Sequence, residues 1–510
     1  MNKKKILLIT PEYPSQGDFN PNDFISSHIR EYINRGLEIE VACINECDSK
    51  FLYEIDGVNV CKTGYNELRS ILMSKKYDAI LVYSLDEQYA EYLKTSYIKD
   101  TIIIVLDDNK KDYNKIAEGI DNVSIMKFER NNNIDKEVSC IKQNIKEPSQ
   151  IIRKVTRVAE NPILTVTIPA YNAENFLHKC LQSLLKTEYA YLTEILVIND
   201  GSKDKTEEIG KIYEDLTTID GKSIVKIINK ENGGHGSGIN KGIELARGKY
   251  FKVVDADDWV NEEDYNKLLE KLIDEDADLI LTDFCEARSF EDKPAKIEYY
   301  RNLKSEITYN FDDICIGEHG FEEWGPMLPT ATYKLQALKK ANFKLFEKTF
   351  YVDMIYNAYS IIYINTVKKY DLDIYRYYIG NVGQSVSEQG MKKNYKNHED
   401  VTIELMRIVT EDKRFSDNKR EYVLKRLCMP MVYVQYYINL DLFHSRKKFL
   451  VFEKRAKQYK ELLQYSEFNK RIIRFHRYTK GIFIRITPFI RRQIGRIRSV
   501  KSKMKKIFKK

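Results

Sequence analysis

The sequence predicts an α/β protein that ends in a basic, helical region. Short β-branched runs alternate with helical patterns over residues 4–145 and again over residues 164–387. From residue 394 onward the strand-like runs stop, and the chain becomes helical and rich in Tyr, Leu and Lys. Because a domain averages roughly 150 residues, a chain of 510 residues has room for about three domains.

Composition excludes several classes of protein. With 43% hydrophobic and 31% charged residues, the chain is neither disordered nor collagen-like. The 8 Cys form no C-x-x-C pair, so we expect no disulfide framework and no zinc knuckle, and a reducing compartment. The apolar run Ile6–Ile9 ends at Pro11, which is too short for a signal peptide, and no run reaches the ~18 apolar residues of a membrane-spanning helix.

The first unit, residues 1–145, contains four apolar runs separated by helical patterns, which predicts a parallel α/β sheet. These runs are residues 6–9, 40–42, 79–82 and 102–106. The segments 5–14, 28–30, 34–38 and 77–82 resemble the N-terminal, Rossmann-like half of family 4 glycosyltransferases. That family places its nucleotide-sugar site mainly in a second Rossmann domain, which does not follow here. The resemblance therefore implies an accessory module, and the polar residues 146–162 are expected to form a linker.

The second unit, residues 163–390, places polar or glycine-rich loops after four successive strand-like runs. The loops begin at Pro169, Asn199, Asn232 and Asp255. The carboxyl ends of strands in an open α/β sheet are where such folds bind nucleotides. The last loop reads Asp255-Ala256-Asp257-Asp258, and two carboxylates in this spacing suit a hard divalent cation that also binds phosphate oxygens.

Taken in order, these four motifs strongly resemble the family 2 glycosyltransferases of GT-A fold, over about 230 residues. The resemblance implies an inverting transferase that uses a nucleotide-diphosphate sugar, most often a uridine one, with Mn²⁺ or Mg²⁺. By the same resemblance, Asp200 accepts a hydrogen bond from the uracil ring, Asp255 contacts the ribose or the metal, and Asp257 coordinates the metal. The other donor-binding residues implied are Pro169, Ala170, Tyr171, Glu174, Asn232 and Gly234.

A sugar transfer of this kind also needs a carboxylate that takes the proton of the acceptor hydroxyl. In the family this base usually lies in a Glu-Asp pair, and here Val352-Asp353 stands at the matching distance. Asp353 is therefore the expected base, with Glu347 as the alternative if the register is shifted. The segment 377–387 resembles the part of the family that closes over the donor diphosphate, which implies phosphate contacts from Gln384 and Ser385.

Some of these residues also have purely structural interpretations. Asp204 fits a helix cap, Asp258 could orient its loop instead of binding a metal, and His235 could be structural or functional. Tyr370, Tyr375, Tyr377 and Tyr378 could stack on sugars or belong to the core.

The positive charge is concentrated at the C-terminal end. The net charge is +7, yet residues 470–510 hold sixteen Lys or Arg and no Asp or Glu, which leaves −9 on the rest of the chain. Over residues 486–510 the apolar positions recur at steps of three and four with cations between them, as in an amphipathic helix that lies on an anionic membrane. A solvated helix packed on its neighbours is the alternative. Nucleic-acid binding is not expected, because no stacking aromatics are interleaved.

The sequence thus predicts a glycosyltransferase that modifies a hydroxyl of a cell-surface glycan or lipid-linked acceptor, in the cytoplasm at the inner face of the cell membrane. A non-catalytic scaffold for glycan assembly that keeps the fold is the alternative, although the four aspartates that are expected in the site argue against it. A nucleotidyltransferase is a third possibility, but the loop that starts at Pro169 does not resemble its glycine-rich motif.

Overall fold

The structure is a computed structural model of the chain. It describes residues 4–11, 24–44, 51–55 and 58–63, shorter pieces between residues 68 and 142, and residues 152–484 except 289–294, 298–299, 301, 317–324, 380–387 and 466–470. The expected phosphate contacts Gln384 and Ser385 and the expected amphipathic segment 486–510 lie outside the described residues.

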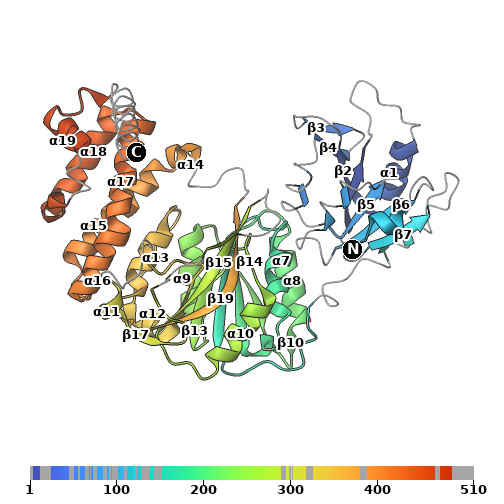
Figure 1. Ribbon diagram of the computed structural model, residues 1–510, viewed down its shortest axis with the longest axis horizontal. Helices are drawn as coiled ribbons and strands as arrows, with labels where there is room; N and C mark the ends of the chain where they lie inside the picture. The colour runs from blue at the N-terminus through green and yellow to red at the C-terminus, as the bar shows by residue number, and fades with distance from the viewer. Residues whose placement is uncertain are drawn as a thin grey trace, which may run out of the picture.

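The N-terminal unit is a seven-stranded sheet of Rossmann-like character, which confirms the predicted fold class (Figure 1). The strand order is β3-β4-β2-β1-β5-β6-β7, and every neighbouring pair is parallel except β3 and β4. The sheet strands are β1 (Lys4–Thr10), β2 (Leu37–Ile44), β3 (Phe51–Ile55), β4 (Val58–Thr63), β5 (Ala79–Tyr83), β6 (Ile102–Asp107) and β7 (Val123–Lys127), and the unit includes helices α1 (Phe24–Asn34) and α4 (Tyr113–Ile116). The central strands are buried on both faces, which is why they read as continuous apolar runs.

The central unit is built on a mixed sheet of ten strands. Four parallel strands come first, in the order β12-β9-β8-β13, and β18, β15, β19 and β14 continue the sheet. The bounds are β8 (Leu164–Ala170), β9 (Thr193–Asn199), β12 (Val225–Asn229), β13 (Tyr250–Val253), β14 (Trp259–Val260), β15 (Leu279–Arg288), β18 (Ala331–Lys334) and β19 (Thr366–Ile379), with β16 (Ala295–Ile297) on β15 and β17 (Thr308–Asn310) on β19. A separate hairpin pairs β10 (Thr218–Ile219) with β11 (Lys222–Ser223).

Helices pack on both faces of this sheet and give a three-layer domain (Figure 1). One core contains apolar residues of α7 (Leu177–Leu185), α8 (Thr206–Leu216) and α10 (Glu262–Leu272). The other contains residues of α9 (His235–Leu245), α11 (Phe311–Ile314), α12 (Leu335–Ala341) and α13 (Val352–Ser360). Residues 152–163, most of which the sequence assigns to the linker, lie against this domain, where Arg153 N donates to Leu185 O and Ala159 N donates to Tyr191 O.

The C-terminal region is helical, as predicted, and shares a core with the central sheet. Buried Phe251 and Leu279 of the sheet belong to the same apolar cluster as Val401, Phe449 and Ile473 of the helices. The helices are α14 (Glu388–Lys393), α15 (Tyr395–Glu411), α16 (Asp417–Tyr422), η3 (Val423–Cys428), α17 (Met429–Tyr437), η4 (Ile438–Leu442), α18 (Arg446–Ala456), η5 (Lys457–Gln464) and α19 (Arg471–Tyr478). Among the residues described, no helix has the length and apolar character needed to cross a bilayer.

Candidate functional site

The loops predicted to carry the site meet at one edge of the central sheet. Because β12, β9, β8 and β13 are parallel, their carboxyl ends lie side by side. Pro169 and Ala170 are the last, buried residues of β8, and Asp200 N donates to Ala170 O at 2.8 Å. Tyr171 follows them and is 54% exposed, so it is the residue of this group that a ligand could reach most easily.

The loop after β8 is tied to the loop after β9 by reciprocal hydrogen bonds. Glu174 N donates to Asp204 Oδ2 at 3.0 Å, and Lys205 N donates to Glu174 Oε2 at 3.1 Å. Asp204 Oδ1 also accepts from Thr206 N, the first residue of α8, at 3.0 Å. Asp204 therefore orders the start of α8 and the loop beside it. One carboxylate oxygen of Glu174 takes part in these hydrogen bonds, and the contact of Glu174 with a nucleotide-sugar donor stays a prediction.

Asp200 organises the glycine-rich loop. Its carboxylate is buried and accepts from Gly233 N at 2.9 Å, Gly234 N at 2.7 Å and Lys230 Nζ at 2.6 Å, while its carbonyl accepts from Asn232 Nδ2 at 3.0 Å. A carboxylate with three donors in place is fixed in orientation. Asp200 and Asn232 therefore shape this loop. The hydrogen bond that Asp200 is expected to accept from a uracil ring stays a prediction.

The glycine loop delivers the N-terminus of α9 to the site. Gly234 has a φ of +80°, which only glycine adopts without strain, and it directly precedes His235 at the start of the helix. A Cβ atom on Gly238 would lie 2.8 Å from Cβ of Pro169, so glycine at that position allows α9 to pack closely on the end of β8. The backbone N–H groups of such a helix end favour an anionic ligand.

His235 joins this helix end to the acidic loop. Its Nε2 lies 2.8 Å from Oδ1 of Asp255. Burial lowers the pKa of His235, but the charges of Asp255, Asp353 and Asp257 outweigh burial and raise it overall. The three carboxylates therefore favour the protonated form of the imidazole, which would act as a local positive charge. The sequence left its role open, and this contact places His235 in the site.

The acidic loop is fixed from behind by β19. Tyr375 OH donates to Asp258 Oδ2 at 2.6 Å and accepts from Asp255 N at 3.1 Å, and Tyr378 N donates to Asp258 Oδ1 at 2.8 Å. Burial, together with the charges of Asp257 and Asp255, raises the pKa of Asp258 well above its usual range. Asp258 therefore orients the loop, which is the structural interpretation of this residue. The sequence does not predict that Tyr375 fixes the acidic loop, because no local pattern marks this role.

Asp353 lies in the first turn of α13, a helix that contacts α9. The side chain of Asn240, on α9, donates to Leu345 O at 3.0 Å and accepts from Leu345 N at 2.9 Å, which fixes the segment that leads into α13. Burial raises the pKa of Asp353, and the charge of His235 opposes part of that rise. These mutual effects place Asp353 beside His235 and Asp255, whereas Glu347 is exposed and pairs with Lys344 at 3.2 Å.

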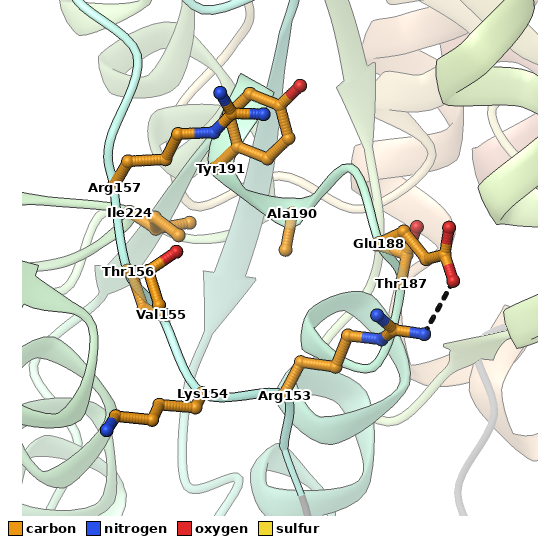
Figure 2. A pocket seen from close by; sticks show the side chains of 10 residues that line it. All are labelled: Arg153, Lys154, Val155, Thr156, Arg157, Thr187, Glu188, Ala190, Tyr191 and Ile224. Carbon is orange, nitrogen blue, oxygen red and sulfur yellow. Dashed lines mark hydrogen bonds and ion pairs between the residues drawn. The ribbon is translucent and has the colours of Figure 1, made fainter.

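A hollow lies at the opposite edge of the sheet. It has a volume of about 380 Å³ and lies beside Ala190 and Ile224, which come just before β9 and β12 begin. In Figure 2 the guanidinium of Arg157 stacks 3.6 Å over the centroid of the Tyr191 ring, and Arg153 pairs with Glu188 at 2.7 Å. Since the strands end at the other edge, this hollow is separate from the cluster around Asp255.

Comparison with known proteins identifies the central domain. Residues 165–321 match the family model described as Glycosyl transferase family 2. A glycosyltransferase of Escherichia coli named YibD is 28% identical over 239 residues, which cover 46% of this chain and 67% of that protein. Glycosyltransferase GlyA of Streptococcus pneumoniae is 30% identical over 161 residues, which cover 31% of this chain and only 22% of that protein.

Among solved structures, residues 1–349 of Staphylococcus aureus TarS in complex with UDP-GlcNAc overlap 59% of this chain and 89% of the TarS chain, at 16% identity and a TM-score of 0.40. The family assignment rests on the family model, and the sequence relatives are named as glycosyltransferases as well. Four of the loops that form the site, after β8, β9, β12 and β13, fall within that segment. Residues 165–321 are thus a family 2 glycosyltransferase domain, as the motifs predict.

Proposed function

We propose that the chain transfers a sugar, with inversion, from a nucleotide-diphosphate donor to a hydroxyl of a cell-surface glycan or lipid-linked acceptor. The observation that carries the proposal is the convergence of Asp255 and His235, which lie in the matched segment 165–321, with Asp353 of the following helix α13. By the resemblance of the motifs to that family, the donor is a uridine-diphosphate sugar.

The roles follow from where each group lies. The N-terminus of α9 and His235 offer positive potential for the diphosphate, which gains negative charge as the bond to the sugar breaks. Asp353, whose charge interacts with those of His235 and Asp255, takes the proton of the acceptor hydroxyl as that oxygen attacks the anomeric carbon. Burial raises the pKa of Asp353, which makes its carboxylate a stronger base than an exposed aspartate.

The acidic loop supports a divalent cation of the Mg²⁺ or Mn²⁺ kind. Among the residues described, no cluster of three or more His, Cys, Asp or Glu side chains forms a complete protein ligand set. Mg²⁺ is commonly bound by one or two carboxylates together with substrate phosphates, so Asp257 and Asp255 fit this mode. When bound, the cation would neutralise charge on the leaving diphosphate. Tyr375 and Asp258 hold the loop that presents both carboxylates.

The first experiment measures binding and slow hydrolysis of UDP-, GDP- and TDP-sugars with Mn²⁺ or Mg²⁺. Wild type is compared with Asp257→Ala and Asp353→Asn, and Asp274→Ala serves as the matched control because Asp274 is exposed at the end of α10. We expect one donor to be hydrolysed in a metal-dependent manner, and Asp257→Ala to abolish hydrolysis. Asp353→Asn should keep donor binding but lower transfer to an acceptor by about 10²–10⁴-fold.

Full turnover by Asp257→Ala with unchanged metal dependence would show that the assigned metal ligand is wrong. Donor binding without turnover under any condition would favour the scaffold for glycan assembly. Loss of function in Asp274→Ala would mean that the assay reports general damage to the domain and not the site.

The tail completes the proposal. Residues 486–510 combine spaced apolar side chains with cations, and we propose that they hold the enzyme on an anionic membrane at the cytoplasmic face, where a lipid-linked acceptor would be found. Deleting residues 486–510 should weaken membrane binding and leave donor hydrolysis unchanged. Undiminished membrane binding after the deletion would refute this part of the proposal.

A further inference from the structure

The last described helix, α19, and the turn that follows it expose four large apolar side chains. Phe475, Tyr478, Ile482 and Phe483 are 39%, 91%, 65% and 45% exposed, and we call them the α19 edge. The rings of Phe475 and Phe483 lie 5.8 Å apart, and Tyr478 follows Phe475 by three residues on the same side of the helix. The opposite side of the segment, which includes Ile473 and Ile484, is buried in the core.

The α19 edge is surrounded by positive charge. Arg474 and Lys480 are exposed within the same segment, and Arg446 lies against it, with its Nε donating to Lys480 O at 2.8 Å. The sequence contains no Asp or Glu from residue 470 to residue 510. Directly after Ile484 the chain continues into residues 485–510, which hold eleven further Lys or Arg. In the sequence, the exposed apolar groups are therefore followed by a segment that is rich in cations and has no acidic residue.

We propose that the α19 edge docks on an anionic lipid bilayer, with its four apolar side chains in the boundary between headgroups and acyl chains. Aromatic rings favour that boundary, and each nearby cation adds attraction to an anionic leaflet. A second copy of this chain fits poorly, because two such surfaces would bring like charges together. A run of cations over residues 470–510 also matches an extended anionic surface better than a single acidic site on a protein.

The α19 edge is connected to the site through packed helices and side-chain contacts. Arg477 of α19 pairs with Glu453 of α18 at 2.9 Å, and both α18 and α19 share the core of α15 and α17. On α15, His398 bonds to Gln435 at 2.6 Å and its ring lies 5.1 Å from the ring of Tyr351, just before α13 begins. Figure 1 shows α19 at the outer end of this helical region, with α18 and α17 between it and the central sheet. Docking would thus set the orientation of the catalytic domain toward the bilayer, a consequence that rests on the proposed function.

The test uses the full chain and vesicles of two compositions, phosphatidylcholine alone and equal parts of phosphatidylcholine and phosphatidylglycerol. The variant is Tyr478→Ser with Ile482→Ser, whose side chains are exposed, so that folding is preserved. The matched control is Ile273→Ser with Ile307→Ser, two side chains of the central domain that are 43% and 48% exposed. Co-sedimentation gives the partition coefficient, and donor hydrolysis without lipid is measured on the same preparations.

We expect wild type to bind the anionic vesicles at least about tenfold more tightly than the neutral ones, and the α19 edge variant to lose at least about tenfold of that binding. The control variant should bind as wild type does. Unchanged vesicle binding by the edge variant would overturn the proposal, because residues 485–510 alone would then account for membrane binding. A change in the oligomeric state of the lipid-free edge variant would overturn it as well, since it would identify a protein as the occupant.

The two readouts separate this proposal from the proposed function. Intact donor hydrolysis in the edge variant together with lost vesicle binding supports docking through the α19 edge. Wild type that binds anionic vesicles through this edge but hydrolyses no donor would refute the proposed function and leave the docking surface supported.

Discussion

Replacing Tyr375 by phenylalanine removes the hydroxyl that holds the acidic loop. The ring stays, so the buried apolar contacts of β19 are kept, and only two hydrogen bonds are lost. One is the bond of 2.6 Å to Asp258 Oδ2, and the other is the bond of 3.1 Å from Asp255 N. Asp258 is 2% exposed, so water cannot easily replace the lost donor.

The expected cost follows from leaving a buried carboxylate oxygen and a backbone N–H without their partner. Such losses destabilise proteins by about 1–3 kcal/mol. The hydrogen bond from Tyr375 also opposes the effects of burial and of Asp257 and Asp255 on the pKa of Asp258, so its removal should raise that pKa further. The loop that presents Asp255 and Asp257 would then be less well fixed, and a displacement of about 1 Å can cost 10²-fold in rate.

The assay compares Tyr375→Phe with Tyr265→Phe by urea unfolding and by donor hydrolysis. Tyr265 is also fully buried, but its hydroxyl has no hydrogen-bond partner among the described residues. We expect Tyr375→Phe to lower the free energy of unfolding by about 1–3 kcal/mol and hydrolysis by about tenfold or more, and Tyr265→Phe to stay within about 0.5 kcal/mol of wild type. Equal stability and equal hydrolysis in the two variants would refute the role of Tyr375.

Three further predictions concern the frame around the site. Asn240→Ala removes both hydrogen bonds to Leu345 and should lower kcat with little change in the donor KM, as steady-state kinetics would show; a change in KM alone would contradict it. Burial lowers the pKa of His398 to about 4 from 6.5, so the unfolded chain binds more protons than the folded chain between these pH values. The free energy of unfolding should therefore fall by about 3 kcal/mol in total as the pH drops from 6.5 to 4. Denaturant unfolding of His398→Gln should show no such decline. Burial also lowers the pKa of Lys252 to about 7 from 10.5, so the free energy of unfolding should rise between pH 7 and 10 by up to about 1.4 kcal/mol per pH unit. Lys252→Met should show a flatter pH profile, and identical profiles for variant and wild type would contradict this.

The elements that the sequence predicts well are those with a local signal. The parallel strands of both sheets are continuous apolar runs, and polar loops follow directly after β8, β9, β12 and β13. That arrangement alone predicts that Asp200 and Asp255 lie at one edge of a sheet. The short strand β3 and the strands β4 and β7 lack such a clear alternation with helices, and the sequence pattern does not predict them.

The contacts that shape the site could not be predicted in the same way, because they join residues far apart in the chain. Tyr375 contacts Asp255 across 120 residues, and Asn240 contacts Leu345 across 105. The sequence left open whether the tyrosines near β19 stack on sugars or pack in the core. Tyr375 and Tyr378 are buried, and both donate hydrogen bonds to Asp258. These two tyrosines therefore have a structural role.

The acidic loop concentrates three carboxylates within four residues, and the structure compensates them unequally. Burial favours the neutral form of Asp258, whereas the hydrogen bonds from Tyr375 and Tyr378 stabilise its charged form, and Asp255 is paired with the ring of His235. The charge of His235 in turn favours the ionised form of Asp353. Like charges held this close repel one another, and a folded domain keeps them only where its framework fixes them or a positive ligand relieves them. The frame supplied by β19 and α9 therefore supports the proposal that this loop receives a cation and a diphosphate, because a loop that is acidic merely through exposure to water needs no such frame.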